Sequence, residues 1–118
     1  MRVVRVTKAG RERSDFPIFV GHVDYQTVIG EESRDLSLSE VAFKSGAVNK
    51  PHKHSTDQIL VVTEGDGFVA TDEERREIST GDVAFIPANT KHWHGARPGK
   101  DMTHWSILGN GKTTIVEE

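Results

Sequence analysis

The nonapeptide Gly46-Ala47-Val48-Asn49-Lys50-Pro51-His52-Lys53-His54 places two histidines two positions apart, behind a glycine and a proline. In an extended strand, residues i and i+2 point to the same side, and strand geometry separates them by about 6–7 Å along the chain. Two imidazoles in this arrangement can bind one metal ion. The stretch therefore predicts an extended segment that carries a candidate metal site.

Two further positions supply the remaining donors of this candidate site. Gln58 follows the histidine pair by four residues, and His92 follows the stretch Gly81-Asp82-Val83-Ala84-Phe85-Ile86-Pro87. Imidazole nitrogen suits zinc, copper, iron and nickel, and an amide oxygen suits manganese or magnesium. All four side chains are neutral, so a divalent ion would keep its full charge and act as a strong Lewis acid. The predicted metal ligands are His52, His54, Gln58 and His92.

The rest of the chain alternates short apolar and polar runs with turn residues, a pattern typical of an all-β protein. Glu64-Gly65-Asp66-Gly67 is expected to form a tight turn, because glycine tolerates positive φ. No window supports a helix of average length, so the sequence predicts a β-sandwich or β-barrel. The expected strands cover residues 3–6, 16–20, 23–29, 36–43, 59–63, 68–71, 75–78, 83–86, 91–96, 102–108 and 113–116.

These stretches resemble the two motifs of a known family. Residues 46–65 resemble the first cupin motif, G-x5-H-x-H-x3,4-E-x6-G, and residues 81–96 resemble the second, G-x5-P-x-G-x2-H-x3-N. The resemblance implies a double-stranded β-helix, the jelly-roll barrel of the cupins, with the metal ligands inside it. We expect one cupin domain over residues 1–118.

Three positions depart from the family motifs. Gln58 stands where the first motif has glutamate, which removes a negative charge and a possible general base. Asn89 replaces a glycine of the second motif, and asparagine tolerates left-handed backbone geometry. Ala96 replaces the last asparagine of that motif. Two roles for Gln58 stay open: binding the metal through its amide oxygen, or hydrogen bonding to a metal-bound water.

The run Lys91-His92-Trp93-His94-Gly95-Ala96, followed by Met102-Thr103-His104, is similar to bacterial cupin-type hydroxynitrile lyases and to cupins associated with carboxymuconolactone decarboxylases. The similarity implies one divalent ion per chain (Mn, Fe, Ni or Zn), with manganese favoured. His104 is the candidate catalytic residue, because an ordinary histidine pKa near 6.5 suits proton transfer. His94 is expected to have a structural or supporting role.

The site allows three functions. The first is a metalloenzyme that acts on a small organic molecule by lyase or isomerase chemistry, with the metal as Lewis acid. The second is a non-catalytic cupin that binds a small molecule. The third is a metal-dependent dioxygenase. Replacing His104 separates the catalytic and binding alternatives, because only a catalyst loses turnover while it keeps its metal.

Composition narrows the partners and the location. The absence of cysteine excludes disulfides, thiolate ligands and a cysteine nucleophile. A net charge of −3 without a basic stripe argues against nucleic acid, and no apolar run is long enough to cross a membrane. The first residues lack the apolar core of a signal peptide, so we expect a cytoplasmic protein. Modest apolar content favours a homodimer with a small-molecule ligand.

Alternation also predicts which side chains face inward. Trp93 and Trp105 alternate with the histidines and are expected on the opposite side of their strands, while Arg97 and Lys100 are expected on a solvent-exposed loop. The expected barrel interior contains Val41, Phe43, Ile59, Val61, Phe85 and Met102.

Overall fold

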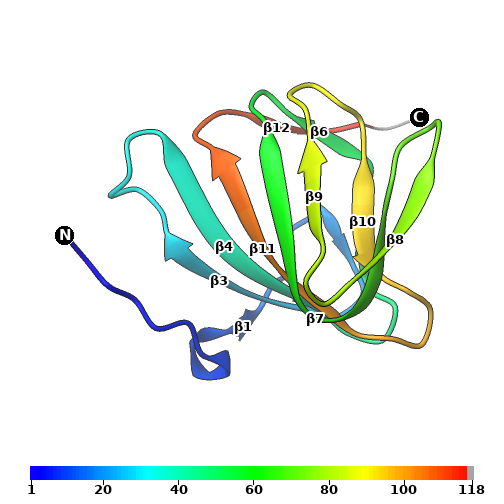
Figure 1. Ribbon diagram of the computed structural model, residues 1–118, viewed down its shortest axis with the longest axis horizontal. Helices are drawn as coiled ribbons and strands as arrows, with labels where there is room; N and C mark the ends of the chain where they lie inside the picture. The colour runs from blue at the N-terminus through cyan, green and yellow to red at the C-terminus, as the bar shows by residue number, and fades with distance from the viewer. Residues whose placement is uncertain (117–118) are drawn as a thin grey trace.

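A computed structural model describes residues 1–116 of the chain, and it is nearly all β-structure (Figure 1). The helix among these residues is the single 3-10 turn η1 (Lys8–Gly10), so no helix there could span a membrane. The strands are β1 (Glu12–Arg13), β2 (Phe19–Val20), β3 (Val23–Ile29), β4 (Leu36–Phe43), β5 (Val48–Asn49), β6 (His52–His54), β7 (Gln58–Ala70), β8 (Arg75–Ser79), β9 (Val83–Ile86), β10 (Trp93–Ala96), β11 (Met102–Gly109) and β12 (Thr113–Ile115).

Strand β7 organises the barrel. Its first half pairs with β11 and β9, and its second half pairs with β10 and β8. The strands therefore follow one curled path, β1-β3-β4-β11-β7-β10-β5-β2, with β8 and β9 attached to β7 (Figure 1). β12 pairs with β6 in a separate two-stranded sheet. This is the jelly-roll architecture that the sequence predicted.

The predicted tight turn at residues 64–67 is wrong, because these residues lie inside β7. Gly65 has a φ of 87°, and the pairing register of β11 shifts between Thr103 and His104. Such a glycine and register shift bend a strand without ending its pairing. The turn signal was real in its φ requirement, but it marks the place where β7 passes from one sheet to the other.

The segment of residues 3–6, predicted to be the first strand, pairs with no strand in the described part of the chain. Its β-branched residues favour extended backbone, but a strand also needs a partner edge, which local sequence does not report. The expected strand over residues 16–20 shrinks to β2 for the same reason. By contrast, β3, β4 and β9 have the predicted bounds.

Side-chain alternation along β7 decides which residues fill the barrel. Gln58, Leu60 and Val62 are buried, whereas Ile59 between them is 37% exposed. The predicted interior positions of Ile59, Val61 and Phe85 are therefore wrong, because the three are cross-strand neighbours on the outer face or share its parity. The predictions for Val41, Phe43 and Met102 are confirmed, since all three are buried in the core cluster.

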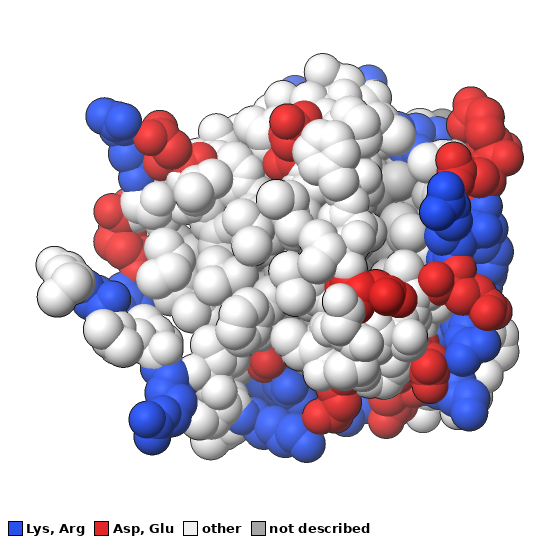
Figure 2. Space-filling model, in the orientation of Figure 1, with Lys and Arg blue, Asp and Glu red and all other residues white. Residues whose placement is uncertain are grey.

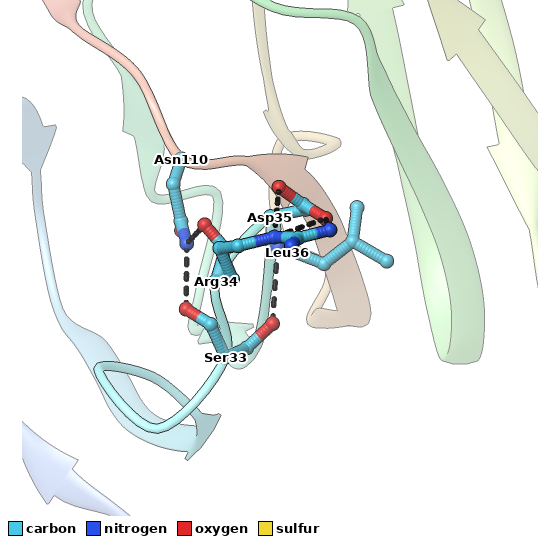
Figure 3. Close-up of polar contacts among 5 residues, drawn as sticks. All are labelled: Ser33, Arg34, Asp35, Leu36 and Asn110. Atoms are coloured by element: carbon cyan, nitrogen blue, oxygen red, sulfur yellow. Dashed lines mark hydrogen bonds and ion pairs between the residues drawn. The ribbon is translucent and has the colours of Figure 1, made fainter.

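Asn110 connects the β11–β12 connection to the loop before β4 (Figure 3). Its amide nitrogen Nδ2 donates to the backbone oxygens of Ser33 and Arg34, each at 2.9 Å, and its backbone N–H donates to the oxygen of Asp35 at 3.0 Å. The hydroxyl of Ser33 accepts a hydrogen bond from the backbone N–H of Leu36 at 3.1 Å. These contacts fix two loops next to β12, whose Thr113 contacts a histidine of the site.

Candidate metal centre

Backbone pairing brings three histidines together. β6 carries His52 and His54 with buried rings on one side and the exposed Lys53 between them. The N–H and C=O groups of His52 bond reciprocally to those of His92, with N···O distances of 3.0 and 2.9 Å. One ligating atom from each of the three residues lies within 4.8 Å of the others. The three histidines could therefore hold one metal ion, as the sequence predicted.

Hydrogen bonds to the Nδ1 atoms leave the Nε2 atoms of these rings available. His52 Nδ1 donates to the backbone oxygen of Lys50 at 2.7 Å, and His92 Nδ1 donates to that of Thr90 at 2.9 Å. In a neutral imidazole with a protonated Nδ1, Nε2 carries a lone pair. His54 Nδ1 lies 2.8 Å from the hydroxyl oxygen of Thr113, and its buried Nε2 has no hydrogen-bond partner among the described residues. Such contacts commonly orient metal-binding histidines.

Gln58 directs an oxygen toward the same point. Its Nε2 donates to the hydroxyl of Ser106 at 2.9 Å, which fixes the orientation of the amide. Its Oε1 then lies 3.1 Å from His92 Nε2. Because His92 is already protonated on Nδ1, both of these atoms are acceptors, and two facing lone pairs are stable when a cation lies between or beside them. The chemistry of this donor set therefore fits a metal ion.

Burial keeps the three histidines neutral. Desolvation, with a contribution from the nearby His92, lowers the pKa of His52 to about 3 and that of His54 to about 4. Desolvation also lowers the pKa of His92 itself. Metal binding needs deprotonated imidazoles. The site therefore has its ligands in the binding state at neutral pH.

His94 and His104 form a second pair beyond the three clustered histidines. Their ring centroids are 4.9 Å apart, and Phe43 packs against both rings. Asn49 holds His94 from two sides: its Oδ1 accepts from the backbone N–H of His94 at 2.8 Å, and its Nδ2 lies 3.2 Å from Nε2 of the ring. Burial lowers the pKa of His94 well below its ordinary value and that of His104 to about 4.

His104 differs from His94 because both of its ring nitrogens are buried without a hydrogen-bond partner in the described part of the chain. A buried polar atom without a partner is destabilising, and such groups are concentrated at functional sites. The sequence predicted this residue from its place on the strand next to the second motif, and the structure places it on the wall of the same cavity as His52 and His54.

The cavity has a volume of about 220 Å³. None of the side chains that line it is a Lys, Arg, Asp or Glu. Aromatic rings form one wall, with Phe16 against Tyr25 at 5.3 Å and Phe19 against Phe43 at 5.9 Å between centroids. The lining residues are Phe16, Ile18, Phe19, Tyr25, Ser37, Ser39, Val41, Phe43, Asn49, His52, His54, Gln58, His94, His104, Ser106, Leu108 and Thr113.

Some residues that sequence reasoning considered lie elsewhere. Arg97 pairs with Asp66 at 3.4 Å and with Glu77 at 3.2 Å, away from the cavity. Trp105 lies opposite Val61 on the outer side of the barrel, as alternation predicted. Sequence reasoning missed Asn49, Ser106 and Thr113, which hold His94, Gln58 and His54. Only Asn49 had a sequence signal, its place within the first motif.

A small jelly-roll barrel with a cluster of histidines inside its cavity defines a class of metal-site proteins. The Cupin domain family matches residues 39–108 of this chain, which is more than half of its length. The chain belongs to the cupin family.

Among curated proteins, the chain is 40% identical over 70 residues to an (R)-mandelonitrile lyase of Granulicella tundricola, covering 58% of this chain and 53% of that protein. It is 33% identical over 81 residues to the dimethylsulfoniopropionate lyase DddW of Ruegeria pomeroyi, covering 66% and 53%. The chain thus spans about half the length of these relatives. A crystal structure of a cupin-like protein from Thermotoga maritima superposes with a TM-score of 0.84 at 30% identity, covering 90% of this chain and 84% of that one.

Proposed function

We propose that the chain is an enzyme that binds one divalent metal ion through His52, His54, Gln58 and His92 and acts on a small organic molecule by lyase or isomerase chemistry. One observation carries the proposal. Four acceptor atoms, three imidazole nitrogens and one amide oxygen, point to one place on the wall of a cavity that also contains the unpartnered His104. Buried acceptors without donors are the expected form of a cation site.

When bound, a divalent ion would supply Lewis acidity. The ligands that the chain offers are neutral and place no negative charge beside it. Manganese is our first choice among Mn, Fe, Ni and Zn, because the oxygen of Gln58 adds a hard donor to three imidazoles. The residues of the second pair, His94 and His104, carry no charge at neutral pH and so leave the electrostatics of the cavity unopposed.

His104 is our candidate for the proton carrier. Its low pKa of about 4 means that the ring is neutral at neutral pH and has a lone pair to accept a proton from a substrate in the cavity. Phe43 and His94 hold the ring in place by packing, and no other described residue competes for its nitrogens. Elimination reactions need such a base, and the names of the two curated relatives support the lyase class.

The metal site is tested first. Purification without a histidine tag and elemental analysis should find about one divalent ion per chain. His52→Ala should remove it, while His22→Ala, at an exposed histidine outside the cavity, should not. A wild-type protein that holds no stoichiometric metal, even after incubation with Mn, Fe, Ni or Zn, contradicts the site.

The catalytic role is tested next, with mandelonitrile as the first substrate and release of benzaldehyde as the signal. His104→Gln should lower turnover by about 10²–10⁴-fold, the usual contribution of a general base, with metal content unchanged. Turnover that survives this change contradicts the role of His104. Binding of small molecules without turnover in the metal-loaded wild type would favour the non-catalytic alternative.

The assembly and location proposed from the sequence are a homodimer in the cytoplasm. Support for the dimer comes from large apolar side chains on the outer face of the barrel, including Val83 at 64% and Phe85 at 61% exposure. Patches of this kind commonly mark interfaces. Fractionation of the native host tests the cytoplasmic location.

A further inference from the structure

The first residues of the chain form an arm that has the composition of a strand but no partner strand. Arg2-Val3-Val4-Arg5-Val6 contains three β-branched residues in five, and Val3 is 90% exposed. We call residues 1–6 the N-terminal arm; in Figure 1 it leaves the barrel at the left edge. Exposed β-branched strands readily pair with another edge. The arm therefore needs an acceptor, which its own barrel does not provide among the described residues.

Only a few polar contacts hold the arm to its own barrel. Arg2 forms an ion pair with Glu32 and donates from Nη2 to the backbone oxygen of Val28 at 2.9 Å. Gln26 donates to the backbone oxygen of Thr7 at 2.9 Å, at the base of the arm. The two side chains of the ion pair are 55% and 44% exposed, and exposed pairs contribute little. The arm can leave this position at small cost.

A groove with two free strand edges lies at the other end of the molecule. It has a volume of about 560 Å³, lies between β8 and β9, and contains none of the histidines. Within the described chain, β8 and β9 each pair only with β7, so each has an unpaired edge. The apolar residues of the groove are Val69, Ala70, Ile78, Val83, Ala84, Phe85, Ile86 and Pro87.

The charges of the groove and the arm are opposite in sign. The groove is lined by Glu74, Glu77 and Asp82, with Arg76 as its single basic residue. The arm carries Arg2 and Arg5 and no acidic residue. Complementary charge steers partners together and fixes their register. A groove with an apolar floor, an acidic rim and two free edges suits a short basic strand of valines.

An apolar face separates the arm from the groove. Cross-strand pairing aligns Leu38, Ile107, Ile59 and Phe85 in one row, and Trp105, Val61 and Val83 in the next. Figure 2 shows that side chains other than Lys, Arg, Asp and Glu cover most of this face, with charged groups mainly toward its edges. Glu40, which continues the second row, is neutralised by Arg11 at 2.7 Å.

We propose that two copies of the chain pack through this face and exchange their N-terminal arms, each arm lying in the β8–β9 groove of the partner. The arm and the groove lie at opposite ends of the face (Figure 1), so a twofold axis through the face brings each arm to the partner's groove. Isologous contacts of this kind are the commonest way for a soluble protein to form a dimer. The exchange also pairs the free edges of β8 or β9.

Arm exchange can be tested by cross-linking, because the chain has no cysteine of its own. Val3→Cys combined with Ala84→Cys should form a disulfide between two chains under mild oxidation, seen as a dimer on a non-reducing gel. Val3→Cys combined with Val20→Cys, on β2, should remain mostly uncross-linked. Dimers that cross-link equally in both double variants, or in neither, contradict the exchange.

Sedimentation velocity of the full, untagged chain tests the interface itself. The wild type should be a dimer at tens of micromolar. Val83→Asp should raise the dissociation constant at least about tenfold, because each copy buries an unpaired charge, and deletion of residues 2–6 should also weaken the dimer. Val20→Asp is the matched control and should not. Circular dichroism confirms that each variant is folded. A monomeric wild type, or a dimer indifferent to Val83→Asp, overturns the proposal.

Discussion

Gln58 is the residue whose exchange says most about the metal centre. Its carbonyl oxygen faces His92 Nε2 at 3.1 Å, and its amide nitrogen is held by Ser106. Glutamate has the same length and keeps an oxygen toward the histidines. Its second oxygen can accept from the Ser106 hydroxyl, which rotates to donate. Gln58→Glu therefore changes the charge of the site while leaving its shape nearly intact.

We predict that Gln58→Glu binds Mn²⁺ more tightly than the wild type, by about tenfold or more, because one negative charge is added next to the cation. Gln58→Leu should bind it more weakly. Competition with a chelator measures the three dissociation constants. Equal constants for all three proteins would show that this side chain does not contact the ion.

At the residue scale, the sequence predicted the three clustered histidines well, because an H-x-H pair on extended backbone has only one arrangement of its rings. It could not predict Thr113, which contacts His54 across 59 positions of the chain. A hydroxyl partner of this kind carries no local pattern. The same holds for Ser106, 48 positions from Gln58.

At the scale of elements, two glycines with similar backbone angles have different surroundings. Gly65, where β7 bends, has a φ of 87°, and a Cβ there would overlap the backbone oxygen of Asp101. Gly81, before β9, has a φ of 93° and open space around the same position. The pair separates the effect of backbone conformation from that of close packing.

We predict that Gly81→Ala lowers the free energy of unfolding by about 1–2 kcal/mol, the cost of left-handed backbone for an L-residue. Gly65→Ala should lower it by several kcal/mol, because overlap with backbone adds to the same cost. Urea denaturation measures both. Equal losses would mean that the chain near Asp101 relaxes freely, contrary to our view of the bend in β7.

The loop contacts of Figure 3 allow a second comparison of this kind. Asn110→Ala removes two hydrogen bonds from its Nδ2 to the backbone and should lower the free energy of unfolding by about 1 kcal/mol. Arg34→Ala removes an ion pair with Asp35 whose side chains are almost fully in solvent, and should have an effect near zero. Thermal unfolding distinguishes the two. A larger effect for Arg34 would contradict this ranking.

Element bounds were predictable where apolar alternation is uninterrupted, as in β4 and β9. They were not predictable where a glycine pair has two meanings. Gly65 and Gly67 fit a hairpin turn, but they also fit a strand that curves between two sheets, and only the strands on either side decide which occurs. The N-terminal arm fails for the related reason that pairing is a property of two segments.

At the scale of the whole molecule, buried histidines make the fold sensitive to acid. The pKa of His52 is about 3 and those of His54 and His104 are about 4, against about 6.5 in the unfolded chain. As pH falls from 6.5 toward 4, the unfolded state binds protons that the folded state does not. The free energy of unfolding therefore decreases as pH falls through this range.

We predict that the metal-free protein loses stability below about pH 6.5, on the order of 1.4 kcal/mol per pH unit for each such histidine. Urea midpoints near neutral and mildly acid pH measure this slope. His104→Gln should make the slope shallower, while His22→Gln, at an exposed position, should change it much less. A stability that stays constant across this interval would contradict the neutral state of the buried rings.

The pairing of β6 with β12 has a consequence for how the protein is made. A nascent chain that has been synthesised through β9 already contains His52, His54 and Gln58, but it lacks His92 and the strand that carries Thr113. Non-local sheets of this kind fold slowly, in milliseconds to seconds. The ion is therefore acquired after synthesis of the barrel, and the metals available in the compartment where folding finishes decide which ion the protein receives.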